Sequence, residues 1–375
     1  MRPCLSCKRR CGFKREDRNN SLLIGSGKGY THGAKHVSEN AHPIYRQSIL
    51  DKPRYGHPGP APQNQPTVRQ VLAEWFDAVS FWKDYTRLIP AANALFHFST
   101  FVVFAWFLTA HFSIAAIVMV VLLSSFIGNT YNTVWYHRYC SHQAFKFRSL
   151  WFARIFLWTN PLFLREESYV IPHRIHHGKS DEPGDPYGPH LGWLGSYLAT
   201  ETVQRTKRNF TAPEYERLVK SLGHVGFISN SYAQYLRTGS VENLWHYFAR
   251  VIAAFLFWGG LAWVVAGWWG VCAWMSGVFL FTFAVRDFNF RGHSSLSGKH
   301  RPGEPANQVF YGLFAGEWHE NHHHYPRLAR SGLQWWQMDV PYYIICAIKW
   351  SGVISEYNSR RPAEIFQASD AEIVV

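Results

Sequence analysis

Two long stretches of the chain contain no charged residues. No Asp, Glu, Lys or Arg occurs between Arg87 and His137, and the 35 residues Val251–Val285 are likewise uncharged. A membrane-spanning helix needs about 20 apolar residues, so the first stretch is long enough for two spans. The second holds two if its first span starts near Leu244. The pattern therefore predicts four spans in two hairpins, at about residues 91–111, 114–136, 247–266 and 268–286.

The segments that flank these spans predict the orientation of the protein. The turns near His111 and near residues 267–270 carry no Lys or Arg, whereas the other flanks are basic. Basic loops stay on the cytoplasmic side, so we expect a multi-pass membrane protein with both termini, and everything between the two hairpins, in the cytoplasm. Apolar residues recur at helical spacing from Val68 to Trp82, which is typical of a helix on the membrane surface. The predicted fold class is an all-α membrane protein with a helical cytosolic cap.

Composition and charge divide the chain into three predicted parts. Residues 1–67 are polar and rich in Gly and Pro, which predicts a disordered basic arm, followed by a membrane domain over 68–350 and a tail over 351–375. The first 55 residues hold twelve Lys or Arg against four Asp or Glu, so most of the net charge of +13 lies in the arm. No nucleic-acid recognition fold accompanies it, and we expect no nucleic-acid partner. A position near anionic lipid suits the arm better.

The remaining composition excludes several classes of protein. Aromatic residues make up 17% of the chain, which is too many for a wholly disordered protein. Six scattered cysteines do not form the framework of a disulfide-rich scaffold. The arm's C-x2-C-x3-C cluster lacks a second ligand pair, so it is weak support for a zinc site.

Three histidine clusters carry the candidate chemistry. They read HRYCSH, HRIHH and HENHH, and one H-x2-H-H pattern is expected only about 0.06 times by chance at this histidine content. On a helix, positions i, i+3 and i+4 fall within about a 100° arc, so three rings share a face. H-x4-H separates two rings by about 140°, which suits ligands of different metals or a helix end that unwinds. The clustered histidines are His137, His142, His173, His176, His177, His319, His322 and His323.

Their placement points to metal binding beside the membrane. All three clusters are predicted on the same membrane face, which surface polarity or core hydrogen bonding does not explain. An isolated histidine such as His97, within the first span, is more simply a core residue. Neutral imidazole suits Fe, Zn, Cu or Ni, and eight histidines exceed what one tetrahedral zinc can use, so two metal ions are predicted. Iron can activate O2 to attack an unactivated C–H bond, whereas zinc has no redox chemistry.

With these motifs, over about residues 70–350, the sequence resembles the integral-membrane fatty acid desaturases, particularly the stearoyl-CoA or delta-9 type. Members of that family carry HR-x3-H, HR-x-HH and H-x2-HH boxes around a di-iron centre, with four spans and a cytosolic cap. Two other stretches look like the family, SDEPGDPYGPHLGW and GEWHENHHHYP. The chain departs from it where GEWH replaces GEGWH or GEGFH, and where His324 adds a third consecutive histidine. Either His322 with His323, or His323 with His324, could coordinate, and register with His319 favours the former.

The resemblance implies further ligands and a reaction. In NFRGH, His293 would be a ninth histidine ligand and Asn289 would hold a metal-bound water. The implied activity is O2-dependent removal of two hydrogens from a saturated acyl chain, on acyl-CoA or acyl lipid, giving a cis double bond at delta-9. No flavin, heme or Fe–S motif is visible, so electrons would come from an external donor such as cytochrome b5, or ferredoxin with its reductase. Basic residues, including 205–208 (RTKR), could dock an acidic donor.

Neighbouring residues are weaker candidates. Glu317 and Glu320 flank the third box, where a carboxylate hydrogen-bonded to a ligand's other ring nitrogen would orient it, although surface solvation explains them equally well. Tyr131, Trp135 and Tyr136 end the second predicted span and could line an acyl channel, although such aromatics are commonly interfacial anchors.

Three other functions fit parts of the pattern. A membrane di-iron hydroxylase or related monooxygenase shares the histidine boxes and would add an oxygen atom to its product instead of removing two hydrogens. A membrane metal carrier would need polar residues inside the spans, where only His97 qualifies. A binding protein that acts through its basic arm would lose function on deletion of residues 1–60.

Overall fold

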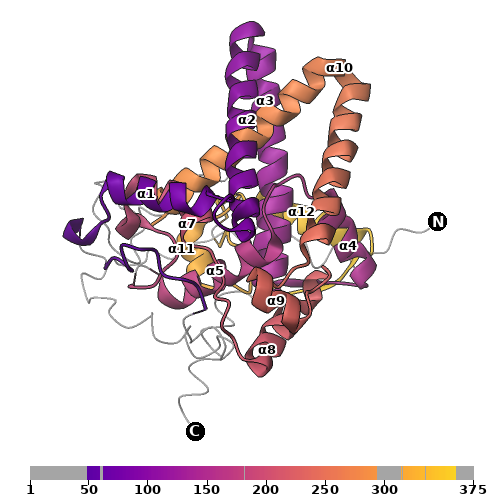
Figure 1. Ribbon diagram of the computed structural model, residues 1–375. Coiled ribbons are helices and arrows are strands. Elements are labelled where there is room, and N and C mark those ends of the chain that lie inside the picture. Colours follow the sequence, from indigo (N-terminus) through magenta and orange to yellow (C-terminus); the bar gives the residue numbers. More distant parts are fainter. Residues whose placement is uncertain are drawn as a thin grey trace, which may run out of the picture. The chain divides into compact units, whose positions relative to one another are not determined.

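The computed structural model describes residues 49–59, 62–180, 182–293, 314, 316–333 and 335–359. Three of its helices are long and apolar enough to cross a membrane. They span Tyr85–Ala110 (26 residues), Ile114–Ser141 (28 residues) and Leu244–Arg291 (48 residues). The first combines η4 (Tyr85–Arg87) with α2 (Leu88–Ala110), and the second combines α3 (Ile114–Ile127) with η5 (Gly128–Ser141). Figure 1 shows α2, α3 and α10 (Leu244–Arg291), and α2 and α3 both pack against α10.

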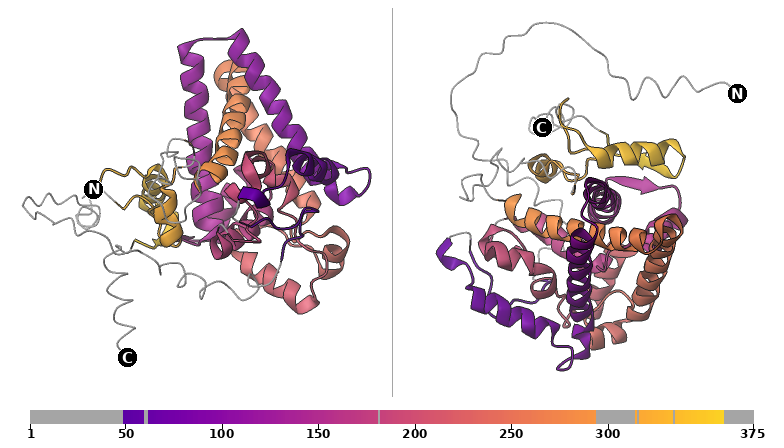
Figure 2. Two further views of the ribbon diagram at one scale, coloured as in Figure 1. Left: turned by 90° about the vertical axis from the view of Figure 1, so that its left-hand side faces the viewer. Right: turned by 90° about the horizontal axis from the view of Figure 1, so that it is seen from above.

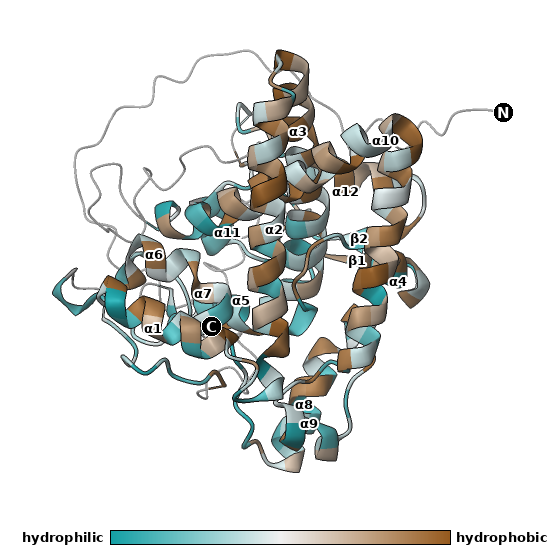
Figure 3. Ribbon diagram, turned by 45° about the horizontal axis from the view of Figure 1, so that its top comes forward, coloured by the Kyte–Doolittle hydropathy of each residue, from teal (hydrophilic) through white to brown (hydrophobic). Residues whose placement is uncertain are grey.

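The helix α10 contains a break in its middle. Ala266 and Gly267 have non-helical backbone angles, and Gly267 has a φ of 59°. Figure 1 shows α10 as two helical arms that meet at this bend. The sequence predicts two spans here, at 247–266 and 268–286, and the break falls at that predicted boundary. Each long helix thus lies where the hydropathy pattern places apolar residues, and Figure 3 shows this character along α3 and α10.

The helix α1 (Val68–Val79) begins at a capping box. The Thr67 side chain accepts a hydrogen bond from the Gln70 backbone, and the Gln70 side chain reaches back to the Thr67 backbone N–H. One face packs on α6 and α7, while the other exposes the side chains of Val68, Leu72 and Phe76. A helix with one buried and one exposed apolar face is suited to a membrane surface. In the right-hand view of Figure 2 this helix, in indigo, lies along the edge of the described structure.

The remaining helices make up most of the part beside the long helices, seen at the lower side of Figure 1. They are η3 (Pro62–Asn64), α4 (Leu150–Thr159), α5 (Glu166–Lys179), η6 (Pro189–Leu191), α6 (Gly192–Tyr197), α7 (Ala199–Thr202), α8 (Ala212–Leu222), η7 (Gly223–Val225), α9 (Tyr232–Thr238), α11 (His319–His324) and α12 (Val340–Trp350).

Two short strands depart from the all-α prediction. Residues Phe145–Phe147 form β1 and residues Ile354–Tyr357 form β2, paired antiparallel with Phe145 opposite Tyr357. They join the end of η5 to the chain that follows α12. The sequence signal for them is weak because each strand has only three or four residues.

The predicted arm and tail fall partly outside the described residues. Nothing is described up to residue 48, but from Ile49 onward the chain packs on the body of the protein, because Leu50 pairs with Thr206 in an isolated β-bridge. At the other end, β2 lies within the predicted tail, and residues after 359 are not described.

Buried ion pairs hold several elements together. Nη2 of Arg250, on α10, contacts both Glu166 at the start of α5 and Glu242 before α10. All three residues are buried, and the Glu166 contact measures 2.9 Å. Removing one partner would leave an uncompensated buried charge, which costs several kcal/mol. These contacts fix α5, which carries the second histidine cluster, against α10.

Candidate metal centre

The first histidine cluster lies at the end of a π-helix. In η5 the backbone N–H of His142 donates to the carbonyl of His137 over 3.2 Å, five residues earlier. Hydrogen bonding from i to i+5 widens the helix and brings residues five apart onto neighbouring turns. His137 and His142 therefore face the same site. The sequence left two alternatives for H-x4-H, ligands of different metals or a helix end that unwinds, and the wider π-helical turn agrees with the second.

The other histidines come from three further segments. The second cluster lies on α5, where His173, His176 and His177 occupy i, i+3 and i+4, and the third occupies α11. His293 follows the end of α10. The helical spacing predicted from the sequence is therefore present in both α5 and α11.

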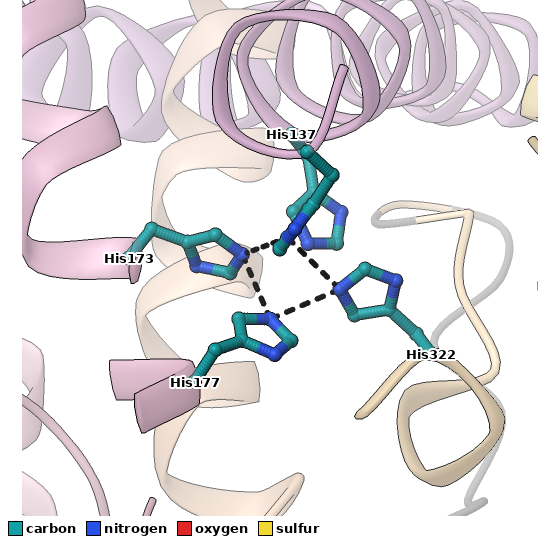
Figure 4. A group of neighbouring side chains, drawn as sticks. His137, His173, His177 and His322 are labelled. Carbon is teal, nitrogen blue, oxygen red and sulfur yellow. Dashed lines mark hydrogen bonds between the residues drawn. The ribbon is translucent and has the colours of Figure 1, made fainter. Parts of the chain in front are cut away.

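Nine histidines assemble into two groups, and within each group one ring nitrogen per residue lies within 4.8 Å of every other. The second and third clusters each contribute histidines to both groups, so each group contains residues from several elements. Figure 4 shows four rings of the first group turned toward one another. The first group is His137, His142, His173, His177 and His322, and the second is His176, His293, His319 and His323.

The rings approach one another through their Nε2 atoms. Nε2 of His173 lies 2.9 Å from Nε2 of His142 and 3.1 Å from that of His177. Nε2 of His322 lies 3.2 Å from that of His142 and 3.0 Å from that of His177. In the second group, Nε2 of His319 lies 2.7 Å from Nε2 of His293. In the first group the same nitrogen of four imidazoles thus converges on one small volume, and in the second group the Nε2 atoms of two imidazoles meet.

Burial favours the neutral form of six of these imidazoles. Desolvation, followed by the neighbouring imidazoles, lowers the pKa of His173, His177 and His322 well below the ordinary value. Burial and nearby imidazoles also lower the pKa of His142, His319 and His323. A neutral imidazole has one nitrogen lone pair free to bind a metal ion.

The residues present fit metal ions. Among the described residues, none accepts or donates a hydrogen bond at Nε2 of His137 or at Nε2 of His323, although both atoms are buried. A buried polar atom with no protein partner costs free energy unless another group binds it. Iron, zinc and copper all bind neutral imidazole, so the donor set suits a transition metal.

Glu317 contacts the outer nitrogens of two clustered rings. Its two carboxylate oxygens lie 3.1 Å from Nδ1 of His137 and 3.2 Å from Nδ1 of His322. The Glu317 side chain is 6% exposed, so surface solvation does not account for it. A carboxylate at Nδ1 directs Nε2 toward the centre of the group. The side chain of Glu320, the other predicted carboxylate, lies outside the described part of the structure.

Asp185 and Tyr187 contact the Nδ1 atoms of two histidines on α5, as Glu317 does for His137 and His322. The sequence analysis assigned no role to either residue. The carboxylate of Asp185 lies 2.8 Å from Nδ1 of His176, and the hydroxyl of Tyr187 lies 2.6 Å from Nδ1 of His173. Asp185 also accepts a hydrogen bond from the Tyr187 backbone N–H. Both belong to the stretch SDEPGDPYGPHLGW, which looks like the family named in the sequence analysis. That likeness was the signal in the sequence that could have identified them.

The arginines of the HR pairs connect the clusters, a role that the sequence analysis also missed. Arg138 is buried and donates to Asp339 and to Ser331, which lie beyond the third cluster. Arg174 donates through Nε to the carbonyl of Ser141 and through Nη2 to that of Cys140. Arg138 therefore fastens the third cluster to η5, and Arg174 fastens η5 to α5.

The structure also distinguishes the two registers of the third cluster. His322 and His323 belong to the two groups, whereas His324 is exposed and belongs to neither. Asn289 is half-buried on α10, four residues before His293.

The three predicted channel aromatics are buried in the core. The Tyr131 hydroxyl donates to Thr159 over 3.0 Å, and Trp135 Nε1 donates to Glu166 over 3.2 Å. The Tyr136 hydroxyl donates to the carbonyl of Leu164. Full burial excludes a role as interfacial anchors for these side chains.

These features define a membrane protein with two buried histidine groups suited to metal binding. Residues 112–339 match the model of the fatty acid desaturase family, which covers more than half of the chain. The chain therefore belongs to the fatty acid desaturase family and is an oxidoreductase that desaturates fatty acyl chains.

Named relatives show the range of substrates in the family. The sn-1 stearoyl-lipid 9-desaturase of Synechocystis sp. is 25% identical, over 76% of this chain and 85% of its own. The Delta-9 acyl-lipid desaturase 1 of Arabidopsis thaliana is 25% identical, over 63% of this chain and 73% of its own. The icosanoyl-CoA 5-desaturase of Limnanthes douglasii is 28% identical, over 62% of this chain and 61% of its own. These relatives differ in both acyl carrier and double-bond position.

Proposed function

We propose that this desaturase uses O2 and a pair of iron ions to introduce a cis double bond at delta-9 of a saturated acyl chain. The observation that carries the proposal is the assembly of nine histidines into two groups of five and four beside apolar helices. Four of the relatives are named as 9-desaturases, which supports this position, while 5- and 7-desaturases also match.

We assign one iron to each histidine group. His137, His142, His173, His177 and His322 would hold the first, and His176, His293, His319 and His323 the second. Asn289 would hold a water ligand of the second iron. When bound, the iron pair supplies the oxidising chemistry that removes two hydrogens from adjacent methylenes.

The chain's own residues position these ligands and exclude water. Glu317 orients His137 and His322 through Nδ1, and Asp185 orients His176. The buried rings of Tyr131, Trp135 and Tyr136 make the neighbourhood of the first cluster apolar, and we keep them as candidates for the wall of the acyl channel.

The reaction also needs electrons and a defined membrane orientation. Reducing one O2 to two waters while oxidising one C–C single bond requires two electrons, and we assign them to an external donor such as cytochrome b5, or ferredoxin with its reductase. If each arm of α10 crosses the bilayer, the protein has four spans, with both termini and the histidine groups on the cytoplasmic side. The desaturase domain would then cover residues 68–350, between the arm and the tail.

Product analysis in a desaturase-deficient host tests the proposal. Expression of the chain should give fatty acids two hydrogens lighter, with the double bond at position 9, whereas a hydroxylase would add one oxygen. His176→Ala and His319→Ala should abolish the product while the membrane-inserted protein stays detectable. His324→Ala is the matched control, because that exposed histidine lies outside both groups and its loss should leave the product unchanged. Product retained in either ligand variant would refute the assignment of that ligand.

A further inference from the structure

The segment around α12 exposes large apolar side chains. Trp335, Trp336 and Met338 precede the helix, Tyr343 and Trp350 lie on it, and each of the five is more than half exposed. The exposed fraction reaches 84% for Trp335 and 83% for Trp350. Apolar patches of this kind mark surfaces that bind another protein or a membrane. We call these five side chains the α12 surface.

The helix α12 is apolar on both its buried and its exposed face. Pro341 and Ile345 are buried, whereas Tyr343 and Trp350 are exposed at i and i+7 and so share the opposite face. The only charged residue in α12 is Lys349, next to its end. A helix with apolar residues on every face is stable only where its outer face meets other apolar groups. Lipid supplies such groups, because the long helices of the chain also expose apolar surface.

The location of α12 also favours contact with lipid. The helix packs on η5, which together with α3 forms one of the three helices long enough to cross a membrane. In the right-hand view of Figure 2 α12, in yellow, is seen from the side, so it lies across the direction in which α3 rises in Figure 1. A helix that lies across a span, beside the end of that span, is placed for the interface between lipid and water.

Positive charge adjoins the end of α12. The Lys349 ammonium donates to the carbonyl of Ser355. Arg148 is exposed, and its backbone N–H donates to the carbonyl of Val353, just after the helix, over 2.9 Å. Tryptophan beside lysine or arginine is typical of the headgroup level of a bilayer, where the indole contacts acyl chains and the cation contacts anionic headgroups. The end of α12 therefore combines the two kinds of side chain that suit a headgroup layer.

The segment before α12 contacts the third histidine cluster. The ring of Trp336 meets that of Trp318 edge to face, with centroids 5.4 Å apart, and Trp318 directly precedes the cluster. Nε1 of Trp318 donates to the carbonyl of Met338 over 2.9 Å. The side chain of Gln337 accepts a hydrogen bond from Asn321, within α11, over 3.0 Å. The α12 surface is therefore joined to the third cluster by direct contacts.

Asp339 joins the start of α12 to two histidine clusters. Its carboxylate accepts from the Tyr342 backbone N–H over 3.0 Å, which caps the helix, and from Nη2 of Arg138, in the first cluster, over 2.8 Å. It also accepts from the Ser331 backbone N–H over 2.6 Å, and the Ser331 hydroxyl accepts from the Trp318 N–H over 3.2 Å. Asp339 is buried, so water does not weaken these bonds. A displacement of α12 would therefore disturb contacts of both clusters.

We propose that the α12 surface docks on the lipid headgroup layer on the side of the histidine groups, and that this contact holds the third histidine cluster in place. The inference goes beyond the desaturase reaction, and it rests on the proposed function only in that the cluster binds iron. The chain would then retain iron more firmly in a bilayer than without lipid. A second copy of the chain and a partner protein are the other candidate occupants, and the experiment distinguishes them.

Photo-cross-linking of the full-length chain in lipid nanodiscs identifies the occupant. The nanodiscs contain phosphatidylcholine and phosphatidylglycerol, and the photoreactive residue p-benzoylphenylalanine replaces Trp335. Irradiation should add the mass of one phospholipid to the peptide that contains this position. The same replacement of Phe98, exposed on α2, should also add lipid, whereas that of Glu216, exposed on α8, should not.

Iron retention tests the link to the third cluster. Trp335→Ser removes the most exposed member of the α12 surface and keeps the next three residues, which contact the cluster. In nanodiscs we expect this variant to lose iron to a chelator about tenfold faster than the native chain, because it loses the burial of a large apolar side chain in lipid. In lipid-free detergent, which provides no continuous headgroup layer, the two should lose iron at the same rate. Trp106→Ser removes an exposed tryptophan of α2 and should match the native chain in both media.

Three outcomes would overturn the proposal. They are a cross-link from position 335 to a second copy or to another protein, no lipid product there while position 98 reacts, and equal iron retention by Trp335→Ser and the native chain in nanodiscs. If Trp335→Ser does not fold, Trp350→Ser repeats the retention test at the other end of the α12 surface. The double bonds formed in the expression host report the proposed function separately. Product without lipid docking refutes only this inference, whereas lipid docking without product refutes the proposed reaction and leaves the docking intact.

Discussion

Glu317 shows how one side chain can control two metal ligands. Its carboxylate is buried and lies within 3.2 Å of Nδ1 of both His137 and His322. Glu317→Gln keeps the shape but removes the charge, so the two imidazoles lose basicity and a fixed orientation. We expect iron affinity to fall by about 10-fold to 100-fold, measured as iron retained per chain during dialysis against a chelator. Glu216→Gln, at an exposed position on α8, should retain native iron content. Equal retention by both variants would show that Glu317 does not support the ligands.

His224 provides a test of pH dependence away from the proposed ligands. Its Nε2 lies 2.9 Å from the carbonyl of Cys140, so a neutral ring that donates this N–H is stable there. Burial, followed by Arg174, lowers the pKa of His224 from 6.5 to about 4. Above pH 6.5 the ring is neutral in both states and stability is full. Between pH 6.5 and 4 the unfolded state takes up a proton that the folded state does not, so stability falls with falling pH.

The variant His224→Gln should reduce that acid sensitivity. Glutamine can still donate to the Cys140 carbonyl but does not titrate, so the loss of unfolding free energy between pH 6.5 and 4 should shrink by up to about 3 kcal/mol. Thermal unfolding in detergent across this pH range measures the difference. His111→Gln, at an exposed histidine, serves as the control. A slope identical to that of the native chain would mean that folding does not lower the pKa of His224.

At the scale of elements, the bend in α10 depends on one glycine. Gly267 has φ 59° and ψ −147°, a combination of backbone angles that residues other than glycine adopt only with strain. No atom lies within 4 Å of the position where a Cβ would be, so Gly267→Ala should destabilise through backbone strain alone, by about 1–3 kcal/mol. Gly259 has equally open surroundings but a helical backbone, and Gly259→Ala should be neutral or stabilising. Thermal unfolding of both variants in detergent tests this, and equal effects would contradict it.

The elements that could be predicted from sequence are those with strong local signals. The long apolar helices follow from runs without charge, and the faces of α5 and α11 follow from i, i+3, i+4 spacing. The π-helical turn of η5 has no such signal, because H-x4-H does not reveal which helix type carries it. Without the change to i+5 bonding, His137 and His142 could not be placed in one group.

The supporting contacts of the site were missed for a different reason. Arg138 and Asp339 lie 201 residues apart in sequence, and no local pattern indicates that they meet. Asp185 and Tyr187 are close to the second cluster in sequence, but their role depends on a turn that brings them back onto α5. Spacing within one helix thus identifies ligands, whereas the residues that orient those ligands come from tertiary packing.

At the scale of the whole molecule, the long helices expose apolar surface, whereas the metal-binding side chains and the carboxylates that support them lie toward the other part of the protein. The first and third apolar helices bury little of their surface against the rest of the described protein, with 6% and 11% of their most apolar segments buried, whereas 39% of that segment is buried in the second. Such exposed apolar surface is stable only in lipid. The histidine groups and their supporting carboxylates lie near or beyond the ends of the long helices, or on other elements. The α2–α3 turn and the bend of α10 lie together at the upper end of Figure 1.

Cysteine labelling in intact cells tests this arrangement and the number of spans. Phe112→Cys marks the exposed α2–α3 turn, Ala266→Cys marks the bend of α10, and Glu216→Cys marks α8 on the proposed cytoplasmic side. A maleimide that cannot cross membranes should label the first two above the background of the parent chain. It should label the third only after permeabilisation, because basic segments stay inside and uncharged turns cross. If Ala266→Cys reacts only after permeabilisation while Phe112→Cys reacts directly, α10 does not form a hairpin across the bilayer. In that case the bend lies on the cytoplasmic side, and the four-span arrangement is wrong.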